Sequence, residues 1–165
     1  MPTRPHRLSL ITAVAALALL GGLSAPSAAA NDRIGWRFVG TYLWVEDESF
    51  QRVVTLHRDG TFSSISQAGP TFGFTGGLGS ATQTGKREIT ATQIDFNFDA
   101  DGNATGVTRA VFVMTFDEKR GGRFQTVQGS LAGETFAPGE DPLDPASTPA
   151  DTFEFDYVGE RVPAD

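Results

Sequence analysis

The sequence predicts an all-β protein: an antiparallel up-and-down barrel of about eight strands that follows a cleaved N-terminal signal peptide. Apolar and polar side chains alternate from Glu88 to Phe98 and from Val107 to Glu118, as they do in half-buried strands. Turn-forming residues separate such segments at hairpin spacing, and no helical period follows Asn31. A two-sheet sandwich would share this pattern. An eight-stranded barrel has just enough interior to hold one small ligand.

Residues 1–30 have the order of a secretory signal peptide. Two arginines precede an apolar run over residues 8–20, and the small residues Ser27-Ala28-Ala29-Ala30 end the segment. The 13-residue run is shorter than the roughly 20 residues that a membrane-spanning helix needs. We therefore expect cleavage after Ala30, no stable membrane insertion, and export to the bacterial periplasm or the medium. Residues 31–165 are enough for one barrel domain with its own core.

Charge and composition exclude several classes of function. Cleavage removes two arginines and no acid, which leaves 11 basic and 20 acidic side chains and a net charge of −9. Such a chain is a poor partner for nucleic acid or anionic lipid. There is no cysteine, and His57 is the one histidine beyond the signal. Disulfides, thiolate zinc sites, histidine-rich zinc sites and cysteine nucleophiles are therefore excluded, and we expect no metal or other cofactor.

The first half of the domain is expected to form three strands. They cover residues 40–45, 50–58 and 61–67, and Asp59-Gly60 supplies a strong hairpin signal between the second and the third. Residues 69–79 are rich in glycine and contain two aromatic residues, so we interpret them as a long mobile loop that acts as a mouth or lid.

The second half contains the two longest predicted strands, residues 88–98 and 107–118. In the first of them, Ile94, Phe96 and Phe98 share a face that should be the core, while Gln93, Asp95 and Asn97 share a polar face. We expect that polar face to be solvated; the alternative is a polar lining inside the barrel, with Arg109 pairing with Asp95. Residues 124–136 and 152–158 supply the remaining strands, and the proline-rich segment 138–150 should be a solvated excursion.

The turn between the two long strands contains Asp99-x-Asp101-x-Asn103, which places oxygen ligands at alternate positions. A calcium loop of this kind would need glycine where Ala104 stands and an acid where Ala110 stands. We therefore interpret the segment as an Asx-rich hairpin loop.

The start of the domain resembles the lipocalin, or calycin, family. Trp36-Arg37-Phe38-Val39-Gly40-Thr41-Tyr42 is similar to the family's opening G-x-W motif, with tyrosine in place of tryptophan, and Arg161 stands where lipocalins often place an arginine over the opening aromatic residue. The segment from Val54 to Phe62 resembles a hairpin of small secreted bacterial lipocalin-like proteins. The resemblance implies a barrel that binds or carries a small hydrophobic molecule. The patterning is also similar to allene oxide cyclase-like and dirigent-like barrels, which steer cyclisation or isomerisation.

Two sets of residues are candidates for the site. The expected ligand-binding residues are aromatic: Tyr42, Trp44, Phe72, Phe74, Phe96 and Phe112. Any catalysis would need a buried polar group, for which Asp95, Arg109 and His57 are candidates. No nucleophile or phosphate-loop motif accompanies them, so a binding protein is favoured over a cyclase or isomerase. An envelope interaction protein with a filled barrel and an adhesive acidic loop at residues 140–151 is the remaining alternative.

Overall fold

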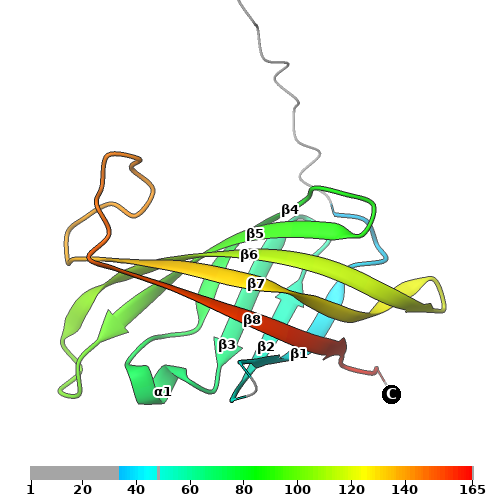
Figure 1. The fold of residues 1–165 in the computed structure, drawn as a ribbon, viewed down its shortest axis with the longest axis horizontal. Helices are drawn as coiled ribbons and strands as arrows, with labels where there is room; N and C mark the ends of the chain where they lie inside the picture. The colour runs from blue at the N-terminus through cyan, green and yellow to red at the C-terminus, as the bar shows by residue number, and fades with distance from the viewer. Residues whose placement is uncertain (1–33, 48, 165) are drawn as a thin grey trace, which may run out of the picture.

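The computed structural model describes residues 34–47 and 49–164, which form a closed barrel of eight antiparallel strands in sequence order (Figure 1). The strands are β1 (Gly40–Glu46), β2 (Phe50–Leu56), β3 (Thr61–Ser66), β4 (Gly77–Gln83), β5 (Glu88–Phe98), β6 (Ala104–Arg120), β7 (Arg123–Phe136) and β8 (Asp151–Arg161); one short helix, α1 (Gly69–Phe72), precedes β4. β8 pairs with β1 and closes the barrel. The predicted fold class is confirmed, whereas the predicted signal, residues 1–30, lies outside the described residues.

Period-2 alternation places one face of each strand in the barrel interior. β6 shows this most regularly, since Ala110, Phe112, Met114 and Phe116 are all buried. In β5 the expected phase is wrong: the polar face with Gln93 and Asp95 points inward, and Phe96 lies on the outer face with 56% of its surface exposed. The sequence of one strand does not show which side chains on other strands will form hydrogen bonds to its polar face, and those hydrogen bonds are what allow the polar face to lie inside.

The expected long loop over residues 69–79 is also wrong. The chain forms α1 and then enters β4 at Gly77. Glycine is needed at this strand start because a Cβ at Gly77 would overlap the side chains of Gln93 and Asp95. The glycine-rich segment is thus partly a strand that leaves room for inward side chains of β5.

The two ends of the barrel differ. At one end, here called the closed end, the chain from Ile34 to Phe38 lies beside the β2–β3, β4–β5 and β6–β7 turns. The other end, here called the mouth, has the β1–β2 turn, α1, the β5–β6 loop and the long β7–β8 connection (Figure 1). In Figure 1 the mouth faces the lower left: the β7–β8 connection and the β5–β6 loop lie on the left, and α1 lies at the bottom.

Aromatic packing and one arginine seal the closed end. Phe38 lies edge-on to Phe116, with ring centroids 5.1 Å apart. The Arg161 guanidinium lies 4.7 Å from the centre of the Tyr42 ring and donates to that phenol oxygen and to the backbone carbonyls of Arg37, Val39 and Phe124. Gly40 has a positive φ of 152°, and a Cβ there would overlap the guanidinium. The predicted placement of Arg161 over the opening aromatic residue is confirmed.

Replacing Arg161 by alanine is expected to lower the free energy of unfolding by about 2 kcal/mol, because three backbone carbonyls lose a charged hydrogen-bond donor. The loss is limited because the site is partly exposed, so that water can replace some of these hydrogen bonds. Urea denaturation of the variant measures the change. Glu160→Ala, at the exposed neighbouring position, is the matched control. Equal stability of the two variants would contradict the sealing role of Arg161.

Candidate functional site

Aromatic side chains fill the middle of the barrel. Trp44 and Tyr157 stack with ring centroids 4.1 Å apart and an interplanar angle of 3°, and Phe112 packs against both Trp44 and Phe62. The Tyr157 hydroxyl donates to the carbonyl of Val113 at 2.9 Å, and burial raises its pKa. This level of the barrel is packed with side chains and offers a floor rather than a deep cavity.

A chain of polar side chains lies between this aromatic floor and the mouth. We call it the mouth cluster: Glu46 from β1, Arg52 from β2, Ser64 from β3, and Gln93 and Asp95 from β5. Arg52 donates through Nε and Nη2 to the Glu46 carboxylate and through Nη1 to Ser64 Oγ at 2.9 Å. The guanidinium carbon also lies 5.6 Å from the centre of the Phe112 ring, which places the cluster directly on the aromatic floor.

The hydrogen bonds of the cluster run in one direction. Ser64 Oγ accepts from Arg52 and donates to Gln93 Oε1 at 2.6 Å. Gln93 Nε2 then donates to Asp95 Oδ1 at 2.8 Å. Asp95 is therefore the last acceptor of a chain that begins at the guanidinium.

Asp95 has no ion-pair partner among the described residues. Only 5% of its surface is exposed, and the nearby guanidinium of Arg52 is paired with Glu46 instead. Burial raises the pKa of Asp95 to about 6, although Arg52 and the hydrogen bond from Gln93 oppose the rise. No hydrogen bond to the second oxygen, Oδ2, is formed within the described part of the chain. Among the described residues, Trp44 Nε1 is the one fully buried side-chain nitrogen or oxygen without a partner. Asp95 Oδ2 is therefore not completely enclosed and can be reached from the mouth.

The mouth is the side from which the cluster can be reached. Asp95, Glu46 and Arg52 each retain 5% exposure, whereas Trp44 and Phe112 beneath them have none. Above the cluster, Phe153 and Phe155 share the inward-facing side of β8 with Tyr157, and their ring centroids are 5.4 Å apart. Phe155 is 38% exposed. The mouth thus combines one partly exposed aromatic side chain, Phe155, with the nearly buried polar side chains of the mouth cluster, and small-molecule sites pair apolar surface with a few polar groups in the same way.

The predicted ligand-binding aromatic residues separate into two groups. Tyr42, Trp44 and Phe112 lie together in the interior and are fully buried. Phe72 is exposed on α1, where it packs edge-on against Phe50 with centroids 5.6 Å apart. Phe74 forms a β-bridge with Asn97, and Phe96 lies on the outer face. The structure does not bring this second group to the interior.

The three catalytic candidates are also separated. Asp95 lies inside the barrel, while His57 is exposed just after β2. Arg109 lies on the outer face, where it pairs with Glu134 and donates to the carbonyl of Pro142 at 2.7 Å. The polar face lines the interior, as the alternative interpretation had it, but the pairing of Arg109 with Asp95 in that alternative does not form, because the β5–β6 register places Asp95 opposite Thr108.

Sequence reasoning missed Glu46 and Arg52. A signal for both was present, since Arg52 alternates with Val54 and Leu56 on the apolar face of β2, and Glu46 continues the face of Tyr42 and Trp44. A charge on an apolar face predicts a buried, paired charge. The turn at Asp99 is as expected: its carboxylate accepts from the backbone N–H groups of residues 101 and 103, which forms an Asx-type loop.

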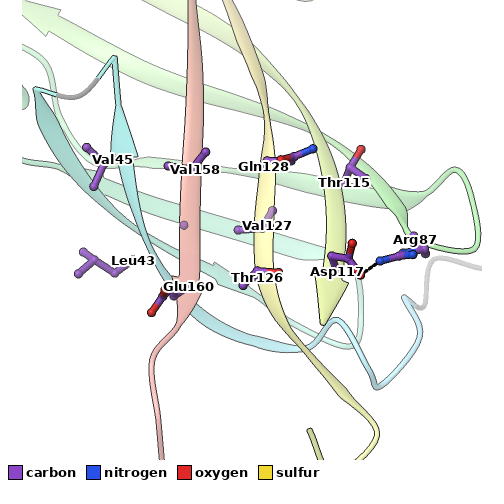
Figure 2. Close-up of a pocket in the computed structure, with 11 residues that line it drawn as sticks. Leu43, Val45, Arg87, Thr115, Asp117, Thr126, Val127, Gln128, Val158 and Glu160 are labelled. Carbon is purple, nitrogen blue, oxygen red and sulfur yellow. Dashed lines mark ion pairs between the residues drawn. The ribbon is translucent and has the colours of Figure 1, made fainter. Parts of the chain in front are cut away.

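A groove of about 660 Å³ on the outer face is the main rival location for a ligand. Figure 2 shows it crossing β1, β8, β7 and β6, with Leu43, Val45 and Val158 among its lining side chains and the Arg87–Asp117 ion pair at one end. Leu43 and Val45 alternate with the buried residues of β1, so they point away from the barrel interior. The groove contains no buried titratable group.

Comparisons with protein-family models, with curated proteins and with solved structures find no match for this chain. Within residues 34–47 and 49–164, no helix has the length and apolarity required to cross a membrane. In the same residues, no three or more histidine, cysteine, aspartate or glutamate side chains are grouped so that they could hold a metal ion.

Proposed function

We propose that the mature protein is an exported barrel that binds a small, mainly apolar molecule at its mouth, with a polar group of that molecule against the mouth cluster. The observation that supports this most strongly is Asp95, a nearly buried carboxylate at the mouth end of the barrel interior with one oxygen that accepts no hydrogen bond within the described residues. The eight-strand up-and-down order is the one that the lipocalin resemblance implies.

The packed interior determines how deep such a molecule can lie. Trp44, Phe62 and Phe112 occupy the middle of the barrel, so the molecule would rest above them rather than within the full length of the barrel. Its apolar part would lie along Phe153 and Phe155, where burial contributes roughly 25 cal/mol per Å² of apolar surface. Its polar part would reach the cluster below.

Fluorescence titration with N-phenylnaphthylamine, a neutral apolar fluorophore, tests this function. The wild-type mature chain is expected to show saturable binding. Ser66 faces inward at the mouth end of β3, while its neighbour Ile65 faces outward. Ser66→Phe should therefore weaken binding by about tenfold, equivalent to about 1.4 kcal/mol, and Ile65→Phe, a matched control, should leave it unchanged.

A variant in the outer groove tests whether the molecule binds there instead of at the mouth. Val158→Arg places a charge in that groove without touching the mouth cluster. If Val158→Arg abolishes probe binding while Ser66→Phe preserves it, the molecule binds outside the barrel and the proposed site is wrong. Absence of saturable binding to the wild type would contradict the proposed function itself.

A barrel cyclase or isomerase is the second candidate, and Asp95 is the observation that favours it. A carboxyl group whose pKa is raised to about 6 by burial can exchange a proton close to neutral pH. Such an enzyme would lose turnover in Asp95→Asn and retain part of it in Asp95→Glu. Full turnover by Asp95→Asn would eliminate this candidate.

A further inference from the structure

The hydrogen bonds within the mouth cluster determine which charge on a ligand it can accept. Arg52, its one cation, donates Nε and Nη2 to Glu46 and Nη1 to Ser64. These bonds use three of the five N–H groups of the guanidinium, and its charge is already compensated by the Glu46 carboxylate. A carboxylate entering the mouth would meet a cation that is already paired and a second carboxylate, Asp95, that repels it.

The direction of the hydrogen-bond chain leads to the same preference. Gln93 is oriented by Ser64 so that its amide nitrogen, rather than its oxygen, points at Asp95. The chain ends in an acceptor, and the free Asp95 Oδ2 can only accept while the group is ionised. What is missing at this position is a donor, and a positively charged donor would also compensate the buried charge.

The charges around Asp95 leave an excess of one negative charge. Glu46 on β1 and Arg52 on β2 form a pair, while Ser64 on β3, Gly77 on β4 and Thr108 on β6 bring no charge. The phenol of Tyr157 on β8 is neutral near pH 7, as tyrosine ordinarily is, and burial raises its pKa further. An ionised Asp95 is therefore the one uncompensated charge of the cluster.

We infer that the molecule bound at the mouth carries a protonated amine, whose ammonium group pairs with the carboxylate of Asp95 while its apolar part lies against Phe153 and Phe155. This inference rests on the proposed function and specifies its ligand class: an apolar organic ammonium ion rather than an apolar carboxylic acid. The ammonium hydrogens would supply the donor that Oδ2 lacks and the charge that the cluster lacks.

Three ligands with the same ring test the inference by competition against N-phenylnaphthylamine: naphthylmethylamine, naphthalenemethanol and naphthoic acid. At about pH 7.5 the amine is expected to bind about tenfold more tightly than the alcohol, through charge-assisted hydrogen bonding, and the acid is expected to bind more weakly than the alcohol. In Asp95→Asn the amine should lose this advantage while the alcohol retains its affinity. Asp156→Asn removes an exposed charge on a different strand, β8, so the three ligands should keep the order of affinity that they have for the wild type.

The outcomes separate the two proposals. If the alcohol binds as tightly as the amine, or if the acid binds best, the ammonium inference is overturned and the proposed function stands. If none of the three displaces the fluorophore and the fluorophore itself does not bind, the proposed function fails as well. Lowering the pH to about 5 protonates Asp95 and should weaken binding of the amine but not of the alcohol. An amine affinity that does not change with pH would contradict pairing with Asp95.

Discussion

Replacing Arg52 by methionine will lower the free energy of unfolding by about 3 to 5 kcal/mol, the usual result of breaking a buried ion pair from one side. The substitution leaves the Glu46 carboxylate without its partner in a site where both side chains are only 6% exposed. It also removes the donor to Ser64 that orients the rest of the cluster. Urea denaturation at neutral pH measures the loss.

A double variant separates the ion pair from simple packing. Glu46→Leu combined with Arg52→Met removes both members of the pair, so neither is left as an unpaired charge and most of the lost stability should return. If the double variant is as unstable as the sum of the two single variants, the cost lies in packing, and the buried ion pair is not what determines it.

Replacing Asp95 by asparagine will stabilise the protein at neutral pH and leave it nearly unchanged in acid. Burial raises the pKa of Asp95 to about 6 in the folded state, against 3.8 for a free aspartate side chain. Because the folded state binds this proton more tightly, its stabilising contribution is fully present below about pH 3.8 and is lost as the pH rises through about 6. Asparagine resembles the protonated form at every pH, so its advantage should grow by about 3 kcal/mol between these limits.

Urea denaturation of wild type and Asp95→Asn at a series of pH values measures this difference. Asp156→Asn, which makes the same substitution at an exposed position, is the control. A difference between Asp95→Asn and wild type that does not depend on pH, or that favours the wild type near neutrality, would contradict an unpaired Asp95.

The fold could be predicted because the strands with regular alternation dominate the chain. The alternation over residues 88–98 and 107–118 predicts the two strands that the structure contains as β5 and β6. Asp59-Gly60 predicts the hairpin that joins β2 to β3. β4 was not predicted, since Gly77-Leu78-Gly79 has the composition of a loop. Its strand conformation depends on β5, whose backbone at Thr92 approaches the position where a Cβ of Gly79 would lie.

The site was predicted less well, for a reason that lies in the tertiary structure. The polar face of β5 lies inside because Ser64 and Gly77, on strands earlier in the chain, give Gln93 and Asp95 a partner and space. The apolar side chains of Phe96 and Ile94 then point outward, against the usual rule for one-sided sheets. The charge of Arg52 on an apolar strand face was the local signal of such an interior.

Native mass spectrometry of the mature protein, purified gently from its own host, tests the central claim that the mouth binds a small molecule. The wild type and the outward variant Ile65→Phe are expected to retain a bound organic molecule, and the inward variant Ser66→Phe is expected to have lost it. A protein that is empty in all three forms, or one that keeps the molecule when Ser66 is replaced by phenylalanine, would contradict binding at the mouth.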